Sequence, residues 1–120
     1  MSGPFDADAL LREYGDPALV HDLARLLVDT LPPQLDAVQS AIDTQDGPGL
    51  RAAAHKLKGS LGAFGVPRAV DLARALEALG SAGTVASAGG QHDALRREVL
   101  DLLDSARAWL SDQPGAPATS

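Results

Sequence analysis

Residues 50–65 read LRAAAHKLKGSLGAFG, and this stretch determines how the rest of the chain is interpreted. Its apolar residues recur at intervals of three and four, which is the period of one face of an α-helix. That face consists of Leu50, Ala53, Ala54, Leu57 and Leu61. The stretch therefore predicts an amphipathic helix whose apolar side packs into a core.

The same spacing continues on both sides of this helix, between residues that favour helix ends. Asp6, Asp16 and Asp46 stand where N-caps are expected. The pair Pro32-Pro33 is expected to end or kink the second helix, because proline lacks the amide donor. Helices are therefore expected over residues 7–13, 17–31, 34–44, 48–63, 68–80 and 92–110, with a flexible connection over 81–90.

The composition also favours a helical protein. The 120 residues are rich in Ala and Leu, whereas Ile occurs once and aromatic residues make up 3%. We expect an all-α fold, an antiparallel four-helix bundle with a short N-terminal accessory helix. Residues 6–110 are expected to form the bundle, with residues 1–5 as an N-terminal extension and residues 111–120 as a disordered tail.

Several classes of function are disfavoured by the same composition. The absence of cysteine excludes a disulfide framework, a thiolate zinc site and a cysteine nucleophile. A net charge of −6 disfavours nucleic-acid binding, which requires a basic surface. No apolar run reaches the roughly 20 residues that span a bilayer, and the N-terminus lacks a secretory signal. We therefore expect a cytoplasmic protein that binds neither membrane nor nucleic acid. Because no further apolar stripe is left clearly unused, we also expect it to be a monomer.

One segment has the opposite charge to the rest of the chain. The 24 residues from Gly47 to Val70 contain no Asp or Glu. They contain four of the ten Lys and Arg residues, among them both lysines of the chain: Arg51, Lys56, Lys58 and Arg68. A basic island of this kind on an acidic protein is suited to steering an acidic partner.

A histidine lies in the middle of this basic segment. His55 projects about 140° away from Leu50 around the helix, so it faces outward. Lys58, three residues later, flanks it, whereas Lys56 points to the other side. A neutral imidazole nitrogen is a good nucleophile, and an adjacent ammonium balances the charge of a phosphoryl group. From the residues alone, a solvated surface histidine remains an alternative.

Two glycines follow the histidine on its side of the helix. Gly59 and Gly62 each cost a helix roughly 0.5–1 kcal/mol relative to alanine. Their position suggests a low surface that a partner approaches closely. The residues expected to bind that partner are Arg51, Ala52, Lys56, Gly59 and Gly62.

Residues 54–60, AHKLKGS, followed by LGAFG, resemble the motif of histidine-containing phosphotransfer (HPt) domains. The later segment 72–77, LARALE, resembles the Leu-Glu helix of that family, and the resemblance covers residues 5–110. It implies that His55 is the phosphoacceptor, that Lys58 supports the phosphoryl group, and that Gly59 keeps the docking surface open. Two positions differ: Ala63 stands where many members carry Asn, and Lys56 replaces a small or hydroxyl residue.

The resemblance also implies the partners. The chain would exchange a phosphoryl group with an aspartate of a response-regulator receiver domain, and act with a sensor histidine kinase or hybrid kinase. The receiver would supply Mg²⁺ and the catalytic groups, so the chain itself is expected to need no cofactor or metal and to be no enzyme. His21 and His92 are interpreted as surface or helix-start residues.

Three alternatives remain open at this point. A non-phosphorylated adaptor would bind a partner through the same face, so His55→Gln would leave binding intact while Lys58→Glu would abolish it. A purely structural bundle would tolerate any surface substitution. An enzyme with its own turnover is least favoured, because no carboxylate in the segment accompanies His55 as an orienting group.

Overall fold

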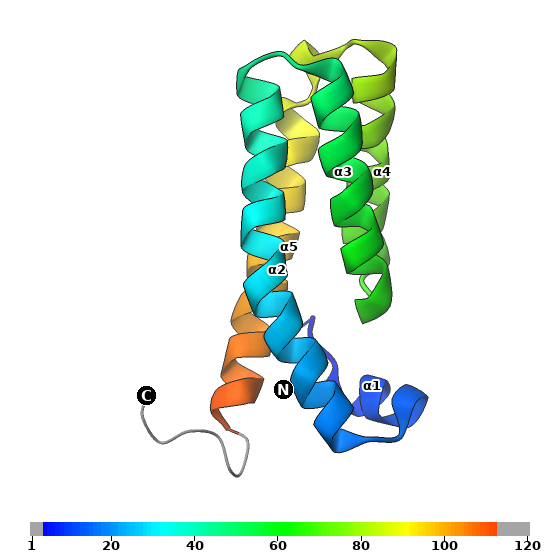
Figure 1. The fold of residues 1–120 in the computed structure, drawn as a ribbon, viewed down its shortest axis with the longest axis vertical. Helices are drawn as coiled ribbons and strands as arrows, with labels where there is room; N and C mark the ends of the chain where they lie inside the picture. The colour runs from blue at the N-terminus through cyan, green and yellow to red at the C-terminus, as the bar shows by residue number, and fades with distance from the viewer. Residues whose placement is uncertain (1–3, 113–120) are drawn as a thin grey trace.

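The computed structural model describes residues 4–112, which form five α-helices and no strand (Figure 1). The helices are α1 (Ala7–Tyr14), α2 (Pro17–Asp43), α3 (Gly47–Leu61), α4 (Pro67–Ala82) and α5 (Gly89–Ser111). Helices α3 and α5 each pack against both α2 and α4, while α1 contacts α2. The predicted all-α fold, an antiparallel four-helix bundle with a short accessory helix, is confirmed.

Three helices begin at the predicted aspartate caps. The carboxylate of Asp6 accepts a hydrogen bond from the Ala9 amide at 3.0 Å, and Asp46 accepts one from Gly49 at 2.9 Å. Asp16 caps α2 in the same way. Each cap satisfies an amide that has no partner within the helix, a contribution of about 1 kcal/mol. The start of α1, α2 and α3 is therefore determined by a residue adjacent to each helix.

Helix α2 is longer than predicted. Pro32 and Pro33 lie inside one continuous helix of 27 residues, so the expected division into two helices is wrong. The buried residues on either side of the prolines form one unbroken stripe, consisting of Val20, Ala24, Leu27, Leu31, Leu35, Val38 and Ala41. Burial of this stripe offsets the roughly 3 kcal/mol that a proline costs a helix interior. The prolines themselves are on the less buried side.

The end of α4 and the connection after it also differ from the prediction. Gly80 lies within the helix, which continues to Ala82 and ends at Gly83, a residue in the left-handed conformation (φ 74°). The connection expected to be flexible contains a short 3₁₀ turn, Val85–Ser87, and buries Val85 and Ala88. These apolar contacts order the connection, a contribution that turn-residue composition does not reveal.

Gly80 is required where α3 and α4 approach each other. A Cβ atom at Gly80 would lie 2.5 Å from the backbone nitrogen of Arg51 and 2.7 Å from the carbonyl oxygen of Gly47. Both are backbone atoms, so relief of this overlap would require the two helices to separate. The glycine at this position permits close packing rather than helix termination.

Replacement of Gly80 by Ala is expected to lower the free energy of unfolding by about 2 kcal/mol, which is typical of overpacking. Gly59→Ala is the matched control, because a Cβ atom at Gly59 meets nothing within 4 Å. That variant is expected to be more stable by about 0.5–1 kcal/mol. Urea denaturation measures both changes, and equal effects of the two substitutions would refute this account of Gly80.

Packing of α3 fixes the direction in which its other side faces. Leu50, Ala54, Leu57 and Leu61 are fully buried, and Ala53 is half-buried.

At the other end of the bundle, Phe5 is buried against Trp109 with ring centroids 5.4 Å apart. The predicted disordered tail lies mostly outside the described residues, which end at 112. No helix over residues 4–112 is long and apolar enough to cross a membrane.

His92 is buried, and its prediction as a surface residue is wrong, although it does lie near the start of α5. Its Nε2 atom has no hydrogen-bond partner among the described residues. Burial lowers the pKa of His92 below its ordinary value of 6.5; Asp93 and Asp43 oppose this decrease, whereas Arg96 adds to it. The folded protein therefore favours a neutral imidazole at this position.

The stability of the protein is expected to decrease as the pH falls below about 6.5, partly because of His92. The unfolded chain takes up a proton at that histidine at a higher pH than the folded chain does, so acid favours unfolding. His92→Gln should reduce this pH dependence. Urea denaturation between pH 7.5 and about 5.5 tests this, and an unchanged slope in His92→Gln would contradict it.

Candidate functional site

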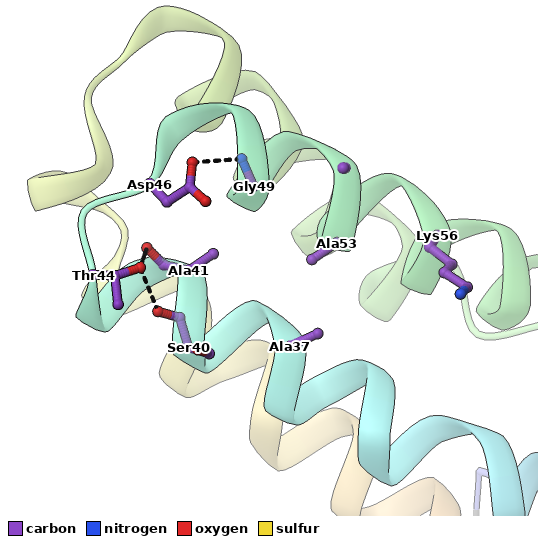
Figure 2. A pocket seen from close by; sticks show the side chains of 9 residues that line it. Ala37, Ser40, Ala41, Thr44, Asp46, Gly49, Ala53 and Lys56 are labelled. Carbon is purple, nitrogen blue, oxygen red and sulfur yellow. Dashed lines mark hydrogen bonds between the residues drawn. The ribbon is translucent and has the colours of Figure 1, made fainter.

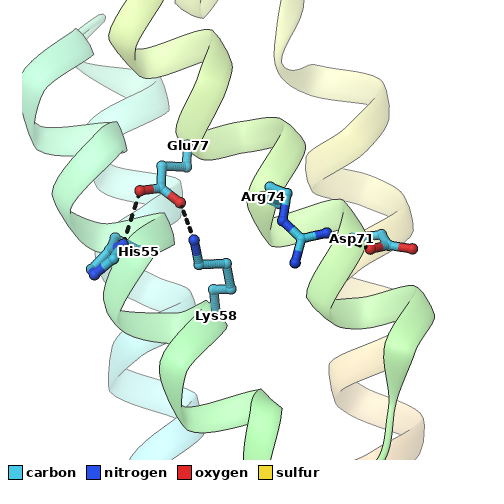
Figure 3. Close-up of polar contacts among 5 residues, drawn as sticks. All are labelled: His55, Lys58, Asp71, Arg74 and Glu77. Atoms are coloured by element: carbon cyan, nitrogen blue, oxygen red, sulfur yellow. Dashed lines mark hydrogen bonds and ion pairs between the residues drawn. The ribbon is translucent and has the colours of Figure 1, made fainter.

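The predicted outward orientation of His55 is present in the structure. Its side chain is 68% exposed, on the side of α3 opposite the buried leucines. The ring is nevertheless held from one side, because its Nδ1 atom lies 2.8 Å from Oε2 of Glu77 on α4 (Figure 3). The ring is therefore oriented by the neighbouring helix and open to solvent at its other end.

Glu77 also binds the lysine of the site. The Nζ atom of Lys58 donates to Oε1 of Glu77 at 2.6 Å, so the two carboxylate oxygens are divided between histidine and lysine. The pKa of Glu77 is lowered chiefly by the hydrogen bond from Lys58, and further by His55, while burial opposes the decrease. Glu77 is therefore a carboxylate at neutral pH, at a position where only 19% of its side chain is exposed.

This pairing determines which tautomer of His55 is favoured. An ionised carboxylate only accepts hydrogen bonds, so Nδ1 must carry the proton that it shares with Glu77. In the neutral ring, Nε2 then has the free lone pair. The arrangement presents one nucleophilic nitrogen on an exposed surface and holds a negative charge behind the ring.

Glu77 is the functional residue that the segment around His55 does not reveal. The statement that no carboxylate accompanies His55 is true of residues 47–70 and wrong for the folded site, since Glu77 comes from 22 positions further along the chain. Antiparallel packing of α4 on α3 brings the two together. The signal for Glu77 in the sequence is the Leu-Glu segment at 72–77, which forms part of the family resemblance.

The other predicted site residues are distributed over two sides of α3. Arg51 and Gly59 are exposed on the same surface as His55, and Ala52 is exposed between that surface and the side of α3 that faces α2. Lys56 faces α2 instead and lines a groove of about 430 Å³ between α2 and α3 (Figure 2). The other residues of that groove are small or polar: Ala37, Ser40, Ala41, Thr44, Asp46, Gly49, Ala52 and Ala53.

The two glycines leave space in front of α3. Gly62 begins the 3₁₀ turn after the helix, and Gly59 lies in its last turn. A Cβ atom at either position would meet nothing within 4 Å, so packing of the fold does not require glycine there. Their presence is consistent with a surface that is kept low for an approaching molecule. Over residues 4–112, no three His, Cys, Asp or Glu side chains are grouped as a metal site would require.

The fold and this site together define a helical bundle that presents a single oriented histidine on one face. The Hpt domain family model matches residues 22–109, and the chain belongs to that family. This membership assigns it to the phosphotransfer proteins of two-component signalling.

The chain is similar to part of several signalling kinases. It is 33% identical over 96 residues to the signal transduction histidine-protein kinase BarA of Shigella flexneri and to that of Escherichia coli K12. The match covers 80% of this chain and spans about a tenth of the length of those kinases, 10% in each case. The fold is similar to the crystal structure of the HPT domain of a Shewanella hybrid histidine kinase, with a TM-score of 0.80, 22% identity, and coverage of 93% of this chain and 97% of that one.

Proposed function

We propose that this chain is a histidine phosphotransfer protein that carries a phosphoryl group on Nε2 of His55, to or from an aspartate of a receiver domain. The observation that carries the proposal is that the two ring nitrogens of His55 have different surroundings: Nδ1 is bound to Glu77, and Nε2 is open to solvent. Membership of the Hpt domain family supports the same chemistry.

The transfer step needs no proton movement in this chain. The lone pair of Nε2 attacks the phosphorus of the aspartyl phosphate, and the bond from phosphorus to the aspartate oxygen breaks. That electron pair leaves with the aspartate carboxylate, while the proton stays on Nδ1. The phosphorylated ring then carries a positive charge, which the carboxylate of Glu77 stabilises from 2.8 Å away. The reverse sequence returns the phosphoryl group to the receiver.

Lys58 supports the site through its ion pair with Glu77, a contact that the sequence did not predict. It holds Glu77 in place through the 2.6 Å contact, and its charge also lies beside the ring to which the phosphoryl group is attached. Its predicted direct contact with that phosphoryl group remains a prediction. We assign no metal or cofactor to this chain, and expect Mg²⁺ and the acidic groups of the reaction on the receiver. The chain is thus proposed to be a monomeric, cytoplasmic phosphocarrier without its own turnover, which also acts with a sensor or hybrid histidine kinase.

Phosphoryl transfer from purified receiver domains tests the proposal. A panel of receivers from the same genome is phosphorylated with acetyl phosphate, separated from it, and mixed with the chain. At least one receiver should transfer acid-labile, base-stable phosphate, and mass spectrometry should locate it on His55. Failure of every receiver and every histidine kinase tested to label the chain would overturn the proposal, and binding without labelling would favour the adaptor alternative.

A further inference from the structure

The cations of the acid-free segment have different surroundings in the folded protein. Lys58 is bound to Glu77, and Nε of Arg68 lies 3.6 Å from Oε2 of Glu98. Lys56 is turned toward α2. Arg51 is exposed and forms no ion pair with any residue between 4 and 112. It is therefore the unpaired cation of this segment on the His55 side of α3.

Arg51 lines an open groove between α3 and α4 with a volume of about 560 Å³. The α4 side consists of Arg74, Glu77, Ala78, Ser81 and Ala82. The charged groups of that side already have partners, because Glu77 binds His55 and Lys58, and Arg74 donates to Asp71 at 2.8 Å (Figure 3). The charge of Arg51 is thus left uncompensated, beside small residues that leave room for an entering side chain.

The groove is continuous with the phosphotransfer site. Arg51 lies one helical turn before His55, and Glu77 belongs to both the groove and the site. A protein that brings a phosphoaspartate to Nε2 of His55 must therefore cover this groove with part of its surface. A carboxylate there would pair with Arg51, whereas a cation would lie unpaired against it.

We infer that Arg51 binds a carboxylate on the surface of the receiver domain, outside the pocket that holds its phosphoaspartate, and that this contact selects among receivers. The inference rests on the proposed function, since the partner is the receiver named there. Arg51 acts in docking and touches neither the reacting nitrogen nor the phosphoryl group. It is a specificity residue, and its removal should weaken binding without slowing transfer in the complex.

Saturation kinetics with a phosphorylated receiver separate these two effects. Arg51→Glu is expected to raise the receiver concentration for half-maximal transfer about tenfold and to leave the maximal rate within about twofold of the wild type. Arg97→Glu is the matched control, because it makes the same charge change at an exposed position on α5, the helix diagonal to α3. Arg51→Ala, with no reversed charge, should show a smaller increase, and circular dichroism checks that each variant is folded.

Salt dependence and charge reversal on the receiver complete the test. The difference in half-saturating receiver concentration between wild type and Arg51→Glu should decrease as NaCl is raised from about 0.05 to about 0.5 M, because salt screens exposed charges. Changing one surface carboxylate near the receiver's phosphorylation pocket to Arg should restore transfer to Arg51→Glu. The inference about Arg51 would be overturned if Arg51→Glu and Arg97→Glu needed the same receiver concentration for half-maximal transfer, or if Arg51→Glu lowered only the maximal rate. Either result would leave the proposed function intact. Absence of transfer to the wild-type chain would overturn the proposed function and this inference together.

Discussion

His55→Gln is expected to reduce phosphoryl uptake from an active receiver by at least about 1,000-fold, to the background of the assay. Glutamine is close to histidine in size and offers an NH₂ group to Glu77, but its amide has no nucleophilic lone pair. The exposed position of His55 means that the fold should tolerate the change. Transfer of labelled phosphate from the receiver, followed by gel separation, measures the loss.

His21→Gln is the control for this experiment, since it removes another histidine that is away from the α3–α4 surface. It should accept phosphate at the wild-type rate. Labelling of His55→Gln at an undiminished rate would show that another residue is the phosphoacceptor. Binding of the receiver should survive in His55→Gln, because the docking surface around the ring is unchanged.

Glu77→Ala is expected to slow transfer about tenfold to a hundredfold, an effect typical of removing a group that orients a reactive imidazole. The alanine variant loses the acceptor for Nδ1–H, the negative charge behind the ring, and the partner of Lys58. Glu77→Gln keeps an acceptor for Nδ1–H and loses the charge, so its rate should lie between those of Glu77→Ala and the wild type. Single-turnover transfer measures both.

A spectroscopic measurement distinguishes orientation of the ring from a general effect on structure. In the wild type, ¹⁵N chemical shifts of His55 should show the proton on Nδ1, and in Glu77→Ala they should show a mixture of tautomers. Asp71→Ala is the control, because it removes a carboxylate of α4 that pairs with Arg74 and does not contact His55. A wild-type ring protonated on Nε2, or full activity in Glu77→Ala, would contradict the assigned role.

The local features that the sequence predicted correctly each depend on one helix at a time. The outward direction of His55 follows from the 3.6-residue period and the positions of Leu50, Leu57 and Leu61, and the aspartate caps are equally local. Continuation of α2 through Pro32 and Pro33 depends instead on how much apolar surface the bundle buries on both sides of them.

The role of Glu77 was beyond prediction for a related reason. Its contact with His55 depends on the register of α4 against α3, which no spacing within either helix specifies. Burial of His92 depends in the same way on what packs over the start of α5. These missed features are thus contacts between helices, whereas the direction of His55 and the aspartate caps are properties of single helices.

The backbone contact between α3 and α4 has a consequence for the reactivity of the protein. Gly80 lies three residues after Glu77 on α4, where it allows that helix to approach Gly47 and Arg51. The separation of the two helix axes at this point limits how far the short side chain of Glu77 must reach to span His55 and Lys58. A residue with no functional group thereby acts as a spacer for the carboxylate, and the orientation of an imidazole on one helix becomes tied to the absence of a methyl group on another.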